Sequence, residues 1–210
     1  SQTSGEEENR LSEGAFPSLL SLDLRSNELC TPIPMIALRL FPSLTALNLS
    51  NNSLTGEIPE GMFSVLKSLK YLNLEVNDLT GRLPDSIGEL ANLVSLNVSS
   101  NGFDGPLPAT LGSLTKLSNL SLHCNDFSGN LIDFRRLVHL CTLDLSFNKF
   151  GGPIPAWVGN LKHLRQFNVN YNASILSFSG AQNFNATLPG WGAASITNPS
   201  PGVLTVNWSN

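Results

Sequence analysis

The chain has 210 residues, of which 41% are hydrophobic and 13% are charged, and its formal net charge is −4. A chain of this size and composition is long enough for one domain with a continuous core. The low density of charge argues against nucleic-acid binding, because phosphates require a concentrated basic surface. No apolar run approaches the length that crosses a bilayer, so the sequence predicts no membrane span within this chain.

The first fifteen residues differ from those that follow. They are polar and acidic, with four glutamates, and Glu-rich starts of this kind are usually flexible. The alternative is that Leu11 and Phe16 begin a cap over the folded part. We therefore separate residues 1–15 as an acidic N-terminal segment.

Residues 16–172 contain seven copies of one pattern, Leu-x-x-Leu-x-Leu-x-x-Asn-x-(Leu/Phe), with occasional replacements and a period of 23 to 25 residues. The copies begin at Leu19, Leu44, Leu69, Leu93, Leu117, Leu140 and Leu164. Their asparagines are Asn27, Asn52, Asn77, Asn101, Asn125, Asn148 and Asn172. A fixed period of this length predicts a solenoid, whose long surface favours binding over catalysis.

The third copy explains why each pattern forms one coil. Leu72 and Leu74 are two residues apart, so a short strand points both into the coil, while Tyr71 and Glu75 face the other way. Asn77 ends the strand, where its amide can bond backbone groups of its own coil and of the neighbouring coil. The stacked copies therefore predict a ladder of buried asparagines.

The second half of four copies reads Gly-x-(Ile/Leu)-Pro, beginning at Gly56, Gly81, Gly105 and Gly152. Glycine permits a tight turn with positive φ, and proline favours an extended start before a short helix. Segments 60–66, 85–90 and 109–114 are therefore predicted to form one or two helical turns on the convex side.

With this second half, the repeat resembles the plant-type leucine-rich repeat of receptor-like kinase ectodomains, receptor-like proteins and polygalacturonase-inhibiting proteins. The resemblance covers residues 16–172 and implies an α/β solenoid, a right-handed superhelix with a parallel β-sheet on the concave face and short helical turns on the convex face. A second short strand often follows the first in this family. Two copies depart from the pattern, because the first has Thr31 in place of glycine and the fifth has Gly129 without Ile-Pro. We expect a local change of curvature at the fifth copy.

The leucine register stops after Asn172. Residues 173–210 are rich in Ser, Gly, Asn and aromatic residues, and segment 196–206 predicts two strands about a Pro/Gly turn. A solenoid must cover the apolar edge of its last coil. Residues 173–210 are therefore predicted to be a C-terminal cap, with a linker to a further region as the alternative.

Cysteines and glycosylation motifs indicate the cellular compartment of the protein. Cys30, Cys124 and Cys141 cannot all pair, and the last two should lie too far apart for a disulfide, so we expect three buried or half-buried free thiols. Seven Asn-x-Ser/Thr motifs favour the secretory pathway, although a repeat rich in Asn and Ser also generates them by chance. Glycans would obstruct the inner sheet at the motifs of Asn48, Asn97 and Asn119. The predicted glycosylation sites are Asn185 and Asn207, outside the repeats, and the expected location is secreted or on the extracellular face of the plasma membrane.

No catalytic motif stands out, so the sequence predicts neither an enzyme nor a cofactor. His139 and His163 hold the same place in successive copies and should stack about 5 Å apart. This is close enough to share a metal ion, but two ligands alone make a weak site, and we predict none. A basic patch on repeats 6 and 7, either a solvated face or a contact for an anion or acidic partner, combines both histidines with Arg135, Arg136, Lys162 and Arg165.

Outward positions of successive strands line up in columns of mostly small polar side chains, suited to bonding an extended peptide or a glycan. The first column consists of Asp23, Asn48, Asn73, Asn97, Ser121, Asp144 and Asn168. The second column consists of Arg25, Ser50, Glu75, Ser99, His123, Ser146 and Asn170. The third column consists of Ser26, Asn51, Val76, Ser100, Cys124, Phe147 and Tyr171. Exposed aromatic residues beside polar groups are typical interface anchors. The predicted ligand-binding residues are Tyr71, Glu75, His123, Phe147 and Tyr171.

Together these features predict a non-catalytic extracellular recognition domain that binds a protein or peptide through the concave or lateral face of the solenoid. One alternative is an inhibitor of a cell-wall-degrading enzyme, although the paired cap cysteines usual in the resembling family are missing. Ice binding by the regular polar columns is another, against which Arg25, Glu75 and Asp144 count as interruptions. A structural scaffold is the fourth.

Overall fold

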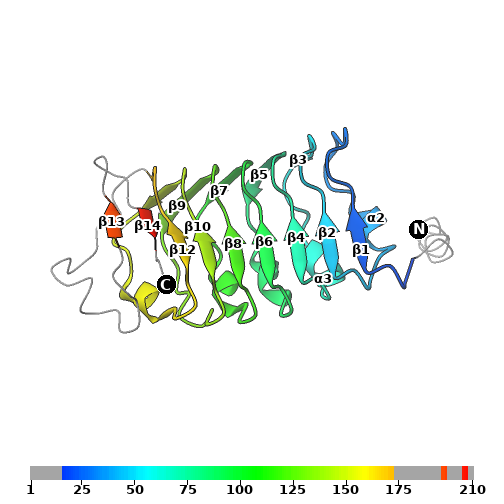
Figure 1. Cartoon of the computed structure of the whole chain (residues 1–210). Coiled ribbons are helices and arrows are strands. Elements are labelled where there is room, and N and C mark those ends of the chain that lie inside the picture. Colours follow the sequence, from blue (N-terminus) through cyan, green and yellow to red (C-terminus); the bar gives the residue numbers. More distant parts are fainter. Residues whose placement is uncertain (1–15, 173–194, 198–204, 208–210) are drawn as a thin grey trace.

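A computed structural model describes residues 16–172, 195–197 and 205–207, which form one elongated stack of coils (Figure 1). Each of seven coils, numbered here in chain order, gives one short strand to a parallel sheet. These strands are β1 (Ser21–Asp23), β2 (Ala46–Asn48), β4 (Tyr71–Asn73), β6 (Ser95–Asn97), β8 (Asn119–Ser121), β10 (Thr142–Asp144) and β12 (Gln166–Asn168). The predicted solenoid with a parallel inner sheet is confirmed.

The register of this sheet stacks equivalent residues of neighbouring coils. Leu72 of β4 lies between Leu47 of β2 and Leu96 of β6, and all three side chains are buried. Behind them, fully buried rings stack at centroid distances of 6.0 and 6.2 Å along Phe103, Phe127 and Phe150. Each coil buries its apolar side against the next, so the stack rather than any single coil is stable.

The asparagine of each repeat forms the predicted ladder. The Nδ2 group of Asn125 donates to the carbonyls of Leu122 and His123 in its own coil, at 3.1 and 3.2 Å. It also donates to the carbonyl of Val98 in the preceding coil, and its Oδ1 accepts the N–H of Phe103, both at 3.0 Å. The bond to the preceding coil recurs at Asn52, Asn77, Asn101, Asn148 and Asn172. Six of the seven amides therefore fasten two coils together, whereas the amide of Asn27, in the first coil, is exposed and donates only within its own coil.

A second, smaller parallel sheet follows the first, as the resemblance implies. Its order is β11-β9-β7-β5-β3, and its strands are β3 (Thr55–Gly56), β5 (Asp78–Arg82), β7 (Gly102–Gly105), β9 (Asp126–Asn130) and β11 (Lys149–Gly151). The glycine of the Gly-x-(Ile/Leu)-Pro pattern turns the chain out of this sheet with a positive φ, for example 76° at Gly81. That conformation is the reason for glycine at this position.

Short helices cover the convex side. They are α2 (Met35–Leu38), α3 (Met62–Val65) and the 3-10 helices η1 (Asp85–Glu89), η2 (Ala109–Ser113) and η3 (Ala156–Asn160). In the fifth coil, which lacks Ile-Pro, residues 131–140 form turns without a helix. Phe134 fills this space and packs edge-on against Trp157 of η3, with ring centroids 5.4 Å apart. No helix in the described ranges has the length and apolar character needed to span a bilayer.

Two further strands, antiparallel to each other, extend the inner sheet beyond β12. β14 (Thr205–Asn207) pairs antiparallel with β12, and β13 (Ser195–Thr197) pairs antiparallel with β14. The two strands predicted within 196–206 are therefore confirmed. The N-terminal segment 1–15 and residues 173–194, 198–204 and 208–210 lie outside the described residues, so the predicted domain boundaries stay a prediction.

Each of the seven parallel strands of the inner sheet leads into a corner that contains one residue with a positive φ. One residue per coil has a φ between 53° and 59°, and these residues are Ser26, Asn51, Val76, Ser100, Cys124, Phe147 and Tyr171. The sequence placed them on the sheet as a third column, whereas they form a corner column at the edge where the strands end. Asn occupies positive φ readily, but a β-branched residue such as Val76 is strained there.

Replacement of a ladder amide tests the bond between coils. Asn125→Ala should lower the free energy of unfolding by about 3 kcal/mol, because buried backbone groups of two coils lose their partner. Denaturant titration followed by circular dichroism measures this change. Asn119→Ala, which removes an exposed amide from the same coil, is the control and should change it by under about 0.5 kcal/mol. Equal effects would contradict the role of the ladder.

Relief of the corner strain is a second test. Val76→Asn should raise the free energy of unfolding by about 1 kcal/mol, because asparagine tolerates a φ of 53° better than valine. Val138→Asn is the matched control, since Val138 is also about half exposed but has no positive φ. Thermal melting compares the two variants, and a loss of stability in Val76→Asn would contradict the strain.

Candidate ligand-binding face

The inner face is bounded by one edge where the strands start and another where they end. Side chains at the strand starts are small or polar with one exception, Tyr71, which is 52% exposed. This column runs Ser21, Ala46, Tyr71, Ser95, Asn119, Thr142 and Gln166. Since the middle residue of each strand points into the core, bare backbone separates the strand starts from the strand ends.

The side chains at the strand ends are fixed by turns of their own. The Oδ1 of Asn48 accepts both the N–H and the hydroxyl of Ser50, at 3.1 and 2.7 Å. The same pair of bonds joins Asn97 to Ser99 and Asp144 to Ser146. Because the oxygen is committed to the turn, the amide nitrogen of each asparagine is the group left for other partners.

The prediction that the next column projects from the face is wrong for its small members. Exposure is at most 8% at Ser50, Ser99, Ser146 and Asn170. The serine hydroxyls point back to the strand-end side chains, so they are not available to a ligand. The spacing Asn-x-Ser, which also makes a glycosylation motif, is the sequence signal for this turn. Members of the column that are exposed or half-exposed are Arg25, Glu75 and His123.

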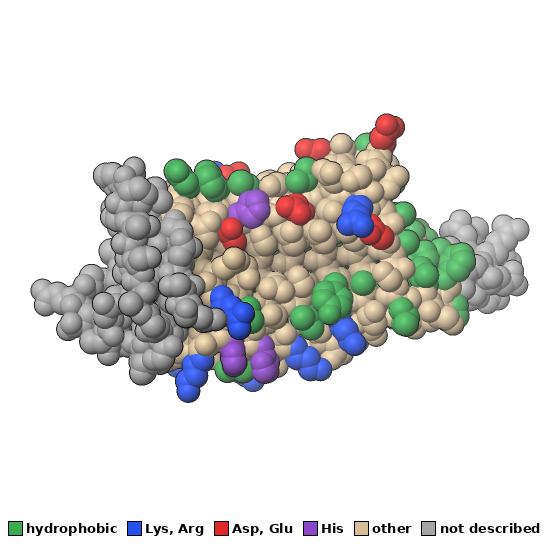
Figure 2. Space-filling model, in the orientation of Figure 1, with side chains coloured by type: hydrophobic (Ala, Val, Ile, Leu, Met, Phe, Trp, Pro, Cys, Tyr) green, Lys and Arg blue, Asp and Glu red, His purple; other side chains and the backbone are tan. Residues whose placement is uncertain are grey.

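Two predicted site residues meet at the corner of coils 6 and 7. The rings of Phe147 and Tyr171 stack with centroids 4.3 Å apart and an angle of 17° between their planes. They are nevertheless 49% and 58% exposed, and Cys124 precedes them in the corner column with an exposed side chain. Figure 2 shows hydrophobic side chains gathered along this upper edge of the inner face, toward the C-terminal coils.

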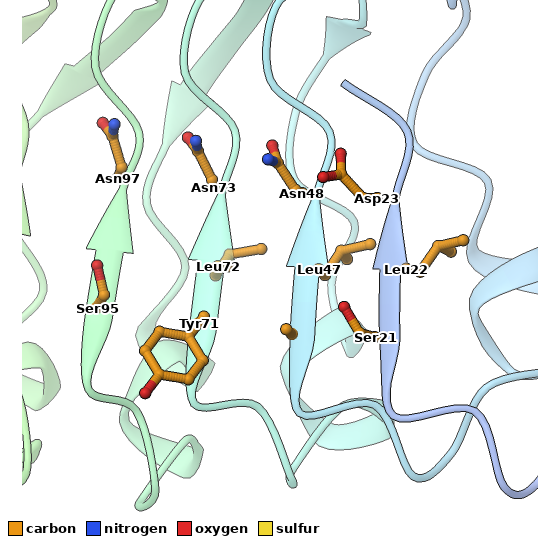
Figure 3. A pocket seen from close by; sticks show the side chains of 11 residues that line it. Ser21, Leu22, Asp23, Leu47, Asn48, Tyr71, Leu72, Asn73, Ser95 and Asn97 are labelled. Carbon is orange, nitrogen blue, oxygen red and sulfur yellow. The ribbon is translucent and has the colours of Figure 1, made fainter. Parts of the chain in front are cut away.

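Tyr71 lies apart from this aromatic pair, at the opposite edge of the sheet and three coils away. It borders a hollow of about 340 Å³ on the inner face of coils 1–4. Figure 3 shows the strand-start side chains along one side of this hollow and a row of strand-end side chains along the other. The strand-end row consists of Asp23, Asn48, Asn73 and Asn97. The five predicted residues therefore do not form one site.

Few charges lie on the inner face. The guanidinium of Arg25 is held by Asp23, with Nε and Oδ2 3.2 Å apart. Glu75 accepts a bond from the Nδ2 of Asn97 at 3.1 Å, and His123 lies two coils further along the same column, half-buried. Glu75 and His123 are thus polar side chains that lie between the centre of the inner face and the aromatic corner.

Basic side chains gather along the edge where the strands start (Figure 2). His139 and His163 stack as predicted, although their ring centroids are 6.4 Å apart. Among the described residues, no group of three or more His, Cys, Asp or Glu could hold a metal ion. Arg135 is paired with Asp133 at 2.6 Å, and bonds from the backbone N–H and side chain of Arg135 lower the pKa of Asp133. The basic patch is therefore partly neutralised.

The three cysteines are free, but the expectation that all are buried or half-buried is wrong. Cys30 and Cys124 are exposed, and Cys141 is half-buried. The inward leucines alternate with positions that face solvent, and the corner turn of Cys124 lies outside the core altogether. Of the predicted glycosylation sites, Asn185 lies outside the described residues, and Asn207 is described only as part of the backbone of β14.

Comparisons with known proteins agree with this architecture. A family model described as a leucine-rich repeat region matches residues 23–180. No curated protein matches the sequence. The plant peptide hormone receptor RGFR1, solved in complex with RGF2, is 33% identical with a TM-score of 0.72, and the match covers 78% of this chain and 26% of that chain.

Two further solved structures are informative. The Arabidopsis receptor kinase HAESA, in complex with the peptide hormone IDA and the co-receptor SERK1, is 34% identical with a TM-score of 0.71, over 75% of this chain and 26% of that chain. A plant ice-binding protein is 28% identical with a TM-score of 0.64, over 73% and 49% of the two chains. This chain thus spans only a part of the length of these proteins. Its repeats, its coil geometry and these matches together show that it belongs to the leucine-rich repeat family, in the plant type.

Proposed function

We propose that this domain is a non-catalytic extracellular recognition module that binds a protein or peptide through the inner face and the strand-end corner. The observation that carries the proposal is the exposed stacked pair Phe147–Tyr171. Of the two similar receptors, RGFR1 is a plant peptide hormone receptor solved in complex with RGF2, and HAESA was solved in complex with the peptide hormone IDA.

Two unfavourable features coincide at these corner positions. Large rings are left half exposed to water, and both residues have a positive φ, which favours Gly or Asn over bulky side chains. Ser26, Asn51 and Ser100 show that small polar residues fit the same corner. Stacking of the two rings offsets only part of these costs, so binding is the simplest reason for two large aromatic residues at this corner.

The proposed ligand path continues from the corner onto the inner face. Glu75 and His123 are its polar contacts, and Tyr71 contributes at the far edge if the ligand crosses the sheet. The basic patch around Arg136, Lys162 and Arg165 is proposed as a separate contact for an acidic partner. A polar rim around aromatic anchors is the usual composition of an interface.

An extracellular location fits this proposal. The similar chains include receptor ectodomains, and the sequence carries glycosylation motifs at Asn185 and Asn207, which we propose are used. Mass spectrometry of protein secreted from plant cells tests both sites. Unmodified Asn185 and Asn207 in secreted protein would refute this part of the proposal.

The aromatic corner is tested with peptides selected from a displayed library of random dodecapeptides. Phe147→Ala and Tyr171→Ala should each weaken the selected peptides about 30-fold, the effect of losing an anchor worth about 2 kcal/mol. Isothermal titration calorimetry measures the affinities. Ile36→Ala is the control, because Ile36 is another exposed large hydrophobic residue and lies on α2, away from the face.

Peptides that bind both corner variants as tightly as the unchanged protein would contradict the proposed site. Melting temperatures of all variants show whether each remains folded. Since Phe147 and Tyr171 are about half exposed, their truncation should leave the fold intact.

A second candidate is ice binding, which the similarity to a plant ice-binding protein favours. Asn48, Asn73 and Asn97 form a regular row whose oxygens are held by turns, at the strand spacing of about 4.8 Å. Purified protein should then show thermal hysteresis or inhibit ice recrystallisation, and the absence of both removes the candidate. The enzyme-inhibitor alternative keeps an inhibition assay against a polygalacturonase as its test.

A further inference from the structure

We propose that the hollow beside Tyr71 binds a neutral saccharide chain, independently of the aromatic corner. The Tyr71 hollow is the 340 Å³ space on coils 1–4, at the lower end of the usual range for small-ligand sites. Its floor is the backbone of β1, β2, β4 and β6. One side is the row of strand starts and the other the row of strand ends (Figure 3).

The ring of Tyr71 offers a platform within this hollow. Its neighbours in the register are Ala46 on one side and Ser95 on the other, and neither side chain is large enough to cover the ring. Tyr71 is the first residue of a strand that pairs on both sides, so the backbone that carries the ring is fixed. An aromatic face without a partner suits the C–H face of a pyranose ring, because it removes apolar surface of both from water.

The opposite row supplies hydrogen-bond donors in a fixed orientation. The Oδ1 of Asn73 accepts the N–H of Glu75 at 3.0 Å, and that of Asn48 is bound to Ser50. In the described part of the chain, neither the Nδ2 of Asn48 nor that of Asn73 has a hydrogen-bond partner. Two amide donors in adjacent strands, about 4.8 Å apart, therefore line the strand-end side of the hollow, with side chains that extend along the strand direction (Figure 3), and are available to hydroxyl or ring oxygens.

The charge of the hollow selects a neutral ligand. Asp23 is the one charged residue among those that line it, and it is already paired with Arg25. An anionic ligand would find no free cation there. A cationic ligand would have to compete with an existing ion pair. Hydroxyl groups need neither, and each can both donate and accept.

The spacing of the donors also separates a saccharide from an extended peptide. Carbonyls on one side of an extended chain recur at about 6.6 Å, twice the rise per residue, so they do not match donors one strand apart. A sugar unit of a linear polysaccharide has a length close to the strand spacing. Successive units of a β-1,4-linked chain are turned over, but each carries hydroxyl or ring oxygens along both edges, so successive units can still offer an acceptor to successive coils.

The test is a titration of the folded protein with three neutral probes, cellohexaose, xylohexaose and mannohexaose, followed by NMR of the backbone amides and the tyrosine rings. At least one probe should give saturable shifts at Tyr71, Asn48 and Asn73. Tyr71→Ala should weaken binding about tenfold, whereas Tyr71→Phe, which keeps the ring, should stay within about twofold. Ile36→Ala, which removes an exposed apolar side chain on α2, is the control and should leave saccharide binding unchanged.

Failure of all three probes to bind, or equal binding by Tyr71→Ala, overturns the inference. The peptide experiment distinguishes this result from failure of the proposed function. If Tyr71→Ala weakens the selected peptides while no saccharide binds, the hollow belongs to the peptide path, and the inference fails while the proposed function stands. If saccharides bind but Phe147→Ala does not weaken any selected peptide, the inference about the hollow stands and the proposed peptide site fails.

Discussion

The amide of one asparagine per coil is the interaction on which the rest of this structure depends. Strands of three residues form few backbone hydrogen bonds, and the chain then turns sharply with polar groups facing inward. The ladder amide satisfies these groups in its own coil and in the preceding one. It thereby sets both the shape of each coil and its distance from the next. The side-chain columns of the inner face are in register because neighbouring strands pair residue by residue, and the ladder amides tie the corner after each strand to the preceding coil.

The sequence predicts the repeated parts of the fold well, because each coil contacts mainly its neighbours and the same local solution recurs. The inward leucines and the asparagine ladder follow from the spacing, and the convex helices follow from the glycines and prolines together with the resemblance to the plant-type repeat. The conformation of the chain after each strand does not follow from the repeat pattern. Alternation of inward and outward side chains holds only while the backbone is extended, and at Ser50 or Ser99 the chain has already begun to turn. Such residues are small and polar in sequence, yet they are buried in the structure.

The candidate site shows the same division. Phe147 and Tyr171 occupy equivalent positions in adjacent coils, so their contact was predictable from the period. Tyr71 is also an outward residue, but a column gives only the order of coils and not the edge of the sheet. Its hollow arises because Ala46 and Ser95 happen to be small on both sides. That combination is a relation between three coils, which no single repeat reveals.

The corner column has a consequence for how such a surface can change. All seven corners share one backbone conformation, while their side chains range from serine to tyrosine. A substitution there alters what the surface presents without moving the chain that carries it. The chemical character of the surface can therefore be changed at one coil without a change in the backbone of the other coils.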